Sequence, residues 1–413
     1  MPTEIVSRID HEGWYIAPPL DPSRPWWVQL STDFPEWDEP FELSLSDQAM
    51  VRASVTIDGA LRTGAATAVS LLAFPPGWLR PLHLRRTLKE AELYAGIAER
   101  GDRDRMFPAP PTNVPMRMRN ARFARLFLPS DGDVLDVRFE SPWQAIHPKV
   151  RRRYHAHRRN RTAHARWWRH RDGPRPTVIA IHGFGADPYW FNEWYFDLPT
   201  LYRAGADVML FTLPFHGPRA ARTSPFSGHG LFAGGFSRIN EAFAQAVFDV
   251  RILVHHLLDE IGAPAVGITG ISLGGHTTAL LAAAEERIAF AVPNVPVASL
   301  PDLIYEWQPV GSLARAGMRA LGRDLVDMRR MMAAHSPLTW SPIIPKAHRM
   351  IIGGVGDRIA PPKHSRLLWQ HWDRCRLHWF PGSHVLHFDR REYLRYFERF
   401  FREIGFLAAI PGA

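Results

Sequence analysis

The segment Gly-Ile-Ser-Leu-Gly-Gly at residues 270–275 constrains the fold of this chain more than any other feature. It follows an apolar run at 265–269 and leads into helix-forming residues at 276–281. A serine between glycines, at the junction of a strand and a helix, is typical of a nucleophile elbow, whose strained turn lifts the hydroxyl to the carboxyl edge of a sheet. The pattern predicts Ser272 as a nucleophile. It also predicts that the backbone N–H of Leu273 points toward the position of the Ser272 hydroxyl. The alternative is a tight turn whose glycines serve only close packing.

Two later strand ends supply candidate partners for this serine. One apolar strand ends at Val-Gly-Asp, which places Asp357 just beyond it, and the next ends at Pro-Gly-Ser before His384. A serine hydroxyl needs a base to take its proton, and the base needs an acid to hold its orientation. The chain order Ser, Asp, His is the one expected after such an elbow. We therefore predict Asp357 as the acid and His384 as the base, with His387 as the rival base.

A fourth segment, His-Gly-Phe-Gly at 182–185, follows a β-branched strand. The charge on a tetrahedral intermediate is stabilised by two preorganised N–H donors. We expect the N–H groups of Leu273 and Phe184 to form this oxyanion hole, with Gly185 as the alternative to Phe184. His182 is expected to be a structural hydrogen-bonding residue.

Together these segments resemble the α/β-hydrolase superfamily over about residues 175–405, through the matching pieces at 182–185, 270–275, 356–362 and 382–384. The resemblance implies an α/β fold with an eight-stranded, mostly parallel sheet and helices on both faces. It also implies a serine hydrolase that works through an acyl-enzyme and needs neither a metal nor another cofactor. The loop at 214–219 departs from the pattern of many relatives, so the branch of the family is open.

The substrate class follows less directly from the sequence. A small-molecule carboxylic ester is the expected substrate. A serine peptidase or amidase of the same fold is an alternative, indicated weakly by the additional Gly275. A catalytically silent binding scaffold is a third interpretation, which an intact triad disfavours.

The chain divides into an N-terminal extension, residues 1–120, and a hydrolase domain, residues 121–405, with a lid insertion at about 296–345. The extension contains a segment rich in tryptophan and proline and two helical patterns, at 1–45, 46–74 and 85–100. A helix pair of this size cannot bury both apolar stripes alone, so we expect the extension to pack near the insertion, or to clasp a second subunit, and to border the substrate pocket.

Finer expectations concern the start of the hydrolase domain and its insertion. Alternating patterns at 121–128 and 134–141 predict two antiparallel strands. A helical pattern at 313–332 carries three methionines near its end, which suit either an acyl pocket or simple packing on the sheet.

The net charge of +9 is concentrated at residues 149–175, which hold 11 Lys or Arg against one acid. We interpret this segment as the solvated face of an antiparallel edge strand, where basic residues discourage aggregation, and we predict no nucleic-acid partner. Peripheral membrane contact stays open, and the sequence does not indicate an oligomeric state. A single cysteine, Cys375, and an acidic N-terminal segment without an apolar run favour a cytoplasmic location.

Overall fold

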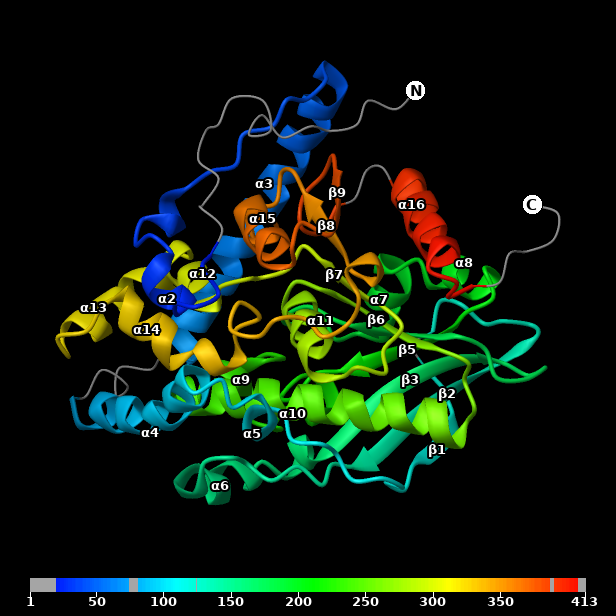
Figure 1. Cartoon of the computed structure of the whole chain (residues 1–413), viewed down its shortest axis with the longest axis horizontal. Coiled ribbons are helices and arrows are strands. Elements are labelled where there is room, and N and C mark those ends of the chain that lie inside the picture. The colour runs from blue at the N-terminus through cyan, green and yellow to red at the C-terminus, as the bar shows by residue number, and fades with distance from the viewer. Residues whose placement is uncertain (1–19, 74–80, 124, 387–389, 408–413) are drawn as a thin grey trace.

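The protein is described from a computed structural model, which places residues 20–73, 81–123, 125–386 and 390–407. Its central feature is a nine-stranded sheet with the order β1-β2-β3-β5-β4-β6-β7-β8-β9 (Figure 1). The strands from β5 to β9 in this order run parallel, whereas β1, β2 and β3 are antiparallel to their neighbours. Their bounds are Arg117–Asn120, Gly132–Glu140, Thr162–His170, Thr177–Ile181, Asp207–Thr212, Val266–Ile271, Ala291–Asn294, Met350–Gly354 and Arg376–Phe380.

The mostly parallel sheet is confirmed, but the expected number of eight strands is wrong. The additional strand is β1, which pairs with residues 135–138 of β2 at the edge of the sheet. The described residues of 121–128 do not form the predicted strand; Ala121 still donates its N–H to Val134 of β2, and the chain leaves the sheet beyond it. The sheet thus starts inside the segment assigned to the extension, and the domain division at residue 120 stays a prediction.

The basic segment is also placed differently from the expectation. Its strand forms at Thr162–His170 as β3, after the helix at Pro148–His155, and β3 lies between β2 and β5 and is not at the edge. Trp167 and Trp168 on β3 are 1% and 0% exposed, and the buried Arg166 pairs with Asp136 at 2.8 Å. The interpretation as a solvated strand face is therefore wrong. The prediction that no nucleic acid binds remains a prediction.

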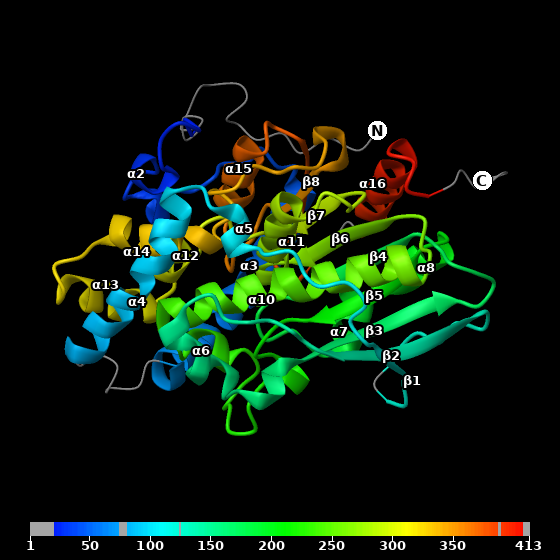
Figure 2. The ribbon, with the colours of Figure 1, turned by 60° about the horizontal axis from the view of Figure 1, so that its bottom comes forward.

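Helices cover both faces of the sheet because side chains on buried parallel strands alternate between two cores. On β4, Ile179 and Ile181 face one core together with α10 and α11, whereas Val178 and Ala180 face the other together with α8 and α16. Figure 2 shows α10 lying along the sheet. These helices and the remaining ones of the hydrolase region are α6 (Pro148–His155), α7 (Tyr189–Tyr195), α8 (Leu198–Arg203), α9 (His229–Phe232), α10 (Gly235–His255), α11 (Leu273–Ala284), α15 (Pro362–His371) and α16 (Arg390–Glu403).

The N-terminal extension packs against the hydrolase region through buried residues. Trp26 and Trp27 are 3% and 5% exposed and belong to the larger core. The two expected helices form as α3 and α4, and α3 runs on into a π-helical turn, η2. The bounds of these elements are α2 (Trp26–Gln29), α3 (Leu45–Ala68), η2 (Val69–Ala73), α4 (Pro81–Glu99) and α5 (Arg103–Met106). No helix in the part of the chain that the structure describes is long and apolar enough to cross a membrane.

The insertion carries three helices, α12 (Leu300–Glu306), α13 (Val310–Arg319) and α14 (Leu325–Met331). The single helix expected at 313–332 is thus wrong: Gly322, with φ of 66°, ends α13 and lets the chain turn into α14. The contact of the insertion with the extension is confirmed by the side chain of Arg329. It pairs with Asp302 and donates to the carbonyl oxygens of Leu30 and Ser31.

Candidate active site

Ser272 occupies the turn between β6 and α11 with φ of 57° and ψ of −113°. This left-handed conformation is strained for a residue with a side chain and is found where surrounding structure enforces it. The surroundings here are close backbone: a Cβ on Gly274 would lie 2.0 Å from the carbonyl oxygen of Ile181. The backbone N–H of Ser272 donates to Asn294 on β7 at 2.9 Å. The turn is therefore fixed by β4, β7 and α11 around it.

Gly275 also has a packing explanation. A Cβ at this position would lie 2.9 Å from the carbonyl oxygen of Asn294 on β7. Close contact between α11 and the sheet thus accounts for this glycine, so it gives no support to a peptidase.

Asp357 and His384 come together although 27 residues separate them. His384 Nδ1 donates to Asp357 Oδ2 at 2.6 Å, and Asp357 Oδ1 accepts the N–H groups of Ile359 and Ala360 at 2.8 and 2.7 Å. Each follows a strand end, β8 for the acid and β9 for the histidine, as the sequence predicts. The acid is 2% exposed and the histidine 5% exposed. This pairing fixes the tautomer of the imidazole, leaving Nε2 as the acceptor.

The electrostatics of this pair follow from burial and from opposite charge. Burial raises the pKa of Asp357, against the stabilising effect of His384. Burial alone would lower the pKa of His384, but the carboxylates of Asp357 and Asp58 together raise it above its ordinary value. The imidazole thus sits where a proton is readily accepted.

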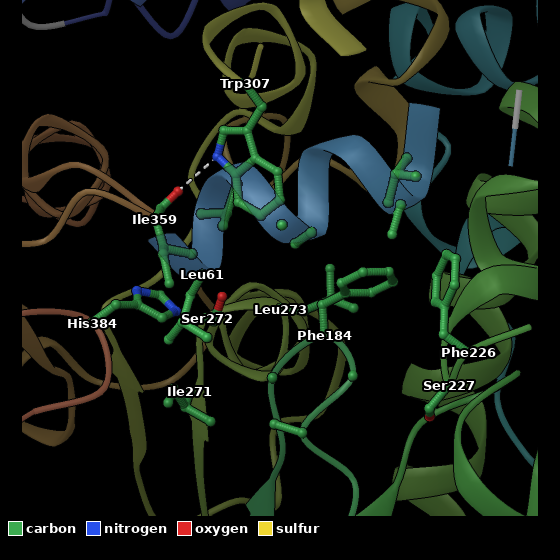
Figure 3. A pocket seen from close by; sticks show the side chains of 18 of the residues that line it. Leu61, Phe184, Phe226, Ser227, Ile271, Ser272, Leu273, Trp307, Ile359 and His384 are labelled. Atoms are coloured by element: carbon green, nitrogen blue, oxygen red, sulfur yellow. Dashed lines mark hydrogen bonds between the residues drawn. The ribbon is translucent and has the colours of Figure 1, made fainter. Parts of the chain in front are cut away.

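Ser272 and His384 line the same cavity, and Figure 3 shows the imidazole turned toward the serine. The rival base, His387, lies outside the described residues. The two candidate oxyanion donors, Phe184 and Leu273, also line this cavity. Leu273 is the first residue of α11, whose leading N–H groups have no acceptor within the helix.

His182 orders the loop that carries Phe184. Its Nδ1 bonds the carbonyl oxygen of Gly183 at 2.7 Å, and its Nε2 accepts the N–H of Leu213 at 3.0 Å. Burial lowers the pKa of His182, which favours the neutral ring that this donor and acceptor pattern requires. The expectation of a structural role agrees with these contacts.

The cavity has a volume of about 740 Å³ and a strongly apolar lining. Its walls include the loop at 183–188, α7, the insertion and the extension helix α3, which lies above Ser272 in the view of Figure 3. No charged carboxylate, lysine or arginine lines it among the described residues; Ser227, Ser272 and His384 are polar lining residues. The expectation that the extension borders the pocket is confirmed by Leu61, Gly64, Ala65, Ala68 and Val69.

The expectation that methionines of the insertion line this pocket is not met. Met328, Met331 and Met332 are at most 4% exposed, and none of them lines this cavity. All three side chains are buried in the larger core or beside it.

Sequence reasoning missed Asp58 on α3. It is completely buried, and its Oδ2 accepts the backbone N–H of His384 at 2.8 Å. The available signal was its position: Val51, Ser54 and Asp58 recur at spacings of three and four, which puts a carboxylate on the stripe of a helix that faces the protein. Nothing in the sequence tells which loops that stripe contacts.

Within the described residues, no group of three or more His, Cys, Asp or Glu side chains could hold a metal ion. His384, paired with Asp357, lines the same cavity as the strained Ser272.

No protein-family model matches the sequence. Two uncharacterized proteins of Mycobacterium tuberculosis, MT2702 of strain CDC 1551 / Oshkosh and Rv2627c of strain H37Rv, are each 30% identical over 248 residues. The match covers 57% of this chain and 56% of each relative, so the chain spans about half the length of the curated relatives it matches.

Solved structures show similarity of fold. Acetyl xylan esterase 1 from Thermoanaerobacterium sp. JW/SL YS485 has a TM-score of 0.52 and 13% identity, covering 77% of this chain and 94% of that one. An acetyl xylan esterase from Paenibacillus sp. R4 has a TM-score of 0.50 and 11% identity, covering 79% and 99%. The chain has the α/β-hydrolase fold.

Proposed function

We propose that this chain is a serine hydrolase that cleaves carboxylic esters with an apolar acyl group. The observation that carries the proposal is the 2.6 Å pairing of His384 with Asp357 at a cavity that also holds Ser272 in its strained elbow. A serine, an oriented imidazole and a buried carboxylate in this order form the triad of acyl transfer.

In the proposed reaction, His384 Nε2 takes the proton of the Ser272 hydroxyl while the oxygen attacks the ester carbonyl carbon. The negative charge moves to the carbonyl oxygen, which accepts hydrogen bonds from the backbone N–H groups of Leu273 and Phe184. Collapse of this intermediate breaks the bond to the alcohol, which leaves with the proton held by His384. Water then attacks the acyl-enzyme by the same steps, releases the acid and restores Ser272. Asp357 orients His384 and stabilises its cationic form throughout.

The preference for an apolar acyl group rests on the composition of the cavity wall. Apolar side chains from several separate segments surround a volume of about 740 Å³, which is within the range of small-molecule pockets. A sugar-like substrate would leave its hydroxyl groups without partners against this wall, at a cost for each unpaired group. The two structural relatives are named as acetyl xylan esterases, but the apolar lining of this cavity favours a different ester.

Fluorophosphonate labelling followed by intact-mass analysis tests the nucleophile. One adduct is expected on the wild-type protein and none on Ser272→Ala, and an adduct that persists in the variant would contradict the assignment. A protein that stays unlabelled and inactive would be the silent scaffold.

A substrate series then tests the leaving group and the acyl group. p-Nitrophenyl esters of increasing chain length are compared with aminoacyl anilides, and kcat/KM should rise with acyl length and exceed that of the anilides. Faster cleavage of the anilides would identify an amidase instead.

A further inference from the structure

We propose that Asp58 and Arg62 of α3 form a clamp that holds two loops together: the acid loop, which follows β8 and carries Asp357, and the histidine loop, which follows β9 and carries His384. Asp58 is then a positioning residue for His384. The inference rests on the proposed function, since it assigns a task in that reaction to the N-terminal extension.

One carboxylate oxygen joins the two loops. Asp58 Oδ2 accepts the backbone N–H of His384 at 2.8 Å and the backbone N–H of Arg358 at 3.2 Å. Arg358 directly follows the acid of the candidate triad, so both sides of the Asp357–His384 bond are tied to the same atom. A shift of either loop would lengthen one of these hydrogen bonds, and small displacements of a catalytic base cost rate steeply.

Arg62 holds the same acid loop from one helical turn further along α3. Its Nη1 donates to the carbonyl oxygen of Arg358 at 2.9 Å, and its Nη2 donates to the carbonyl oxygen of Glu306 in the insertion. Residues four apart lie on the same face of a helix. The N–H and the C=O of Arg358 are therefore both fixed by α3, and the clamp reaches the pocket wall as well.

The burial of Asp58 favours a task beyond packing. The side chain is completely buried, and its Oδ1 has no hydrogen-bond partner in the described part of the chain. Burying a carboxylate with an unused acceptor destabilises a fold, so its presence at a site contributes something other than stability. Gly356 leaves room for this approach, because a Cβ there would lie 2.8 Å from Val51 of α3.

The clamp also acts through charge. The carboxylates that face His384 are Asp357 from the loop after β8 and Asp58 from α3, and the cations nearby are Arg62 and Arg358. Both carboxylates raise the pKa of His384. The base must be neutral to accept the serine proton, so removing the charge of Asp58 should lower this pKa and move the acid limb of kcat/KM to lower pH.

The test compares Asp58→Asn with Ser54→Ala. Ser54 is equally buried, one turn earlier on α3, and its hydroxyl donates only within the helix, to Val51. The readouts are kcat, KM, Tm and the pKa of the His384 ring by NMR titration, with its signal assigned by loss in His384→Gln.

We expect Asp58→Asn to lower the ring pKa and to lower kcat by about tenfold or more, with a smaller change in KM. Ser54→Ala should leave both unchanged. A lower Tm with an unaltered ring pKa and kcat would reduce Asp58 to a structural residue and overturn the inference.

Arg62→Met provides a second test of the clamp if Asp58→Asn does not fold. It should lower kcat without lowering the ring pKa, because it removes a cation and not a carboxylate; an unchanged kcat would contradict the clamp. A wild-type protein that does not label at Ser272 would refute the proposed function, whereas the NMR titration would still report whether Asp58 sets the pKa of His384.

Discussion

The two halves of the candidate site are held in different ways. The elbow at Ser272 is fixed by neighbours in the sheet, through backbone contacts with Ile181 and Asn294. The half with Asp357 and His384 lies on two loops that are tied by α3, which precedes them by some 300 residues in the chain. The position of Ser272 thus depends on the sheet, whereas the positions of Asp357 and His384 depend on the extension as well.

This difference teaches which part of a site a motif describes. A strained turn needs glycines at fixed neighbouring positions, so it leaves a local record in the sequence. A loop held from a distance needs only one carboxylate and one guanidinium on a helix, which look like ordinary polar residues.

The largest expected effect separates the two candidate bases. His384→Ala should lower kcat by several orders of magnitude, because the serine loses the base that accepts its proton. His387→Ala, the matched variant three residues on, should retain most of the activity. Steady-state kinetics on both proteins checks this, and the reverse ranking would make His387 the base.

A second variant tests how the extension is attached to the rest of the protein. Arg329 and Asp302 are both fully buried, and Arg329 also donates to carbonyl oxygens of the extension. Arg329→Ala should lower the free energy of unfolding by about 3–5 kcal/mol, because it leaves a buried carboxylate unpaired. Arg330→Ala, which removes more exposed pairs with Glu92 and Glu99, should cost about 1 kcal/mol or less. Denaturant unfolding measures both, and equal effects would contradict the role of Arg329.

A third variant tests the turn that carries Ser272. Gly274→Ala places a methyl group against backbone oxygens of Ile181 and His182 that cannot move without disturbing β4. It should lower stability by about 3 kcal/mol and abolish fluorophosphonate labelling. A folded, fully labelled variant would show that the turn tolerates a side chain.

The smallest effect tests the α3 wall of the pocket. A Cβ on Gly64 meets no heavy atom within 4 Å. Gly64→Ala should therefore stabilise the helix by roughly 0.5–1 kcal/mol with little change in activity. Gly64→Leu should project into the cavity and lower kcat/KM for long acyl chains more than for short ones. Parallel loss for all chain lengths would show that this wall does not contact the acyl group.

The core of the fold could be predicted because buried parallel strands and their terminal turns are encoded locally. The strands β4, β6 and β9 lie where apolar runs placed them. The order of the sheet edge could not: the pattern at 121–128 suits a strand, yet β1 forms at Arg117–Asn120. The segment that pairs at the edge of a sheet is selected by its contacts with neighbouring parts of the chain. The alternation of apolar and polar residues does not contain that information.

The candidate site could be predicted to the same depth. Glycines and strand ends led to Ser272, Asp357 and His384; Ser272 and His384 line one cavity, and Asp357 pairs with His384. Asp58 could not be found in this way, because its partners are backbone groups of distant loops and no motif requires them. A carboxylate on a buried helix stripe was the sole trace.

The length of chain between α3 and the loops it holds has a consequence for how activity is gained and lost. Contacts between positions this far apart close a large loop and form late in folding, after local turns and helices exist. A ribosome therefore synthesises the nine strands of the sheet before His384 is available to bind Asp58.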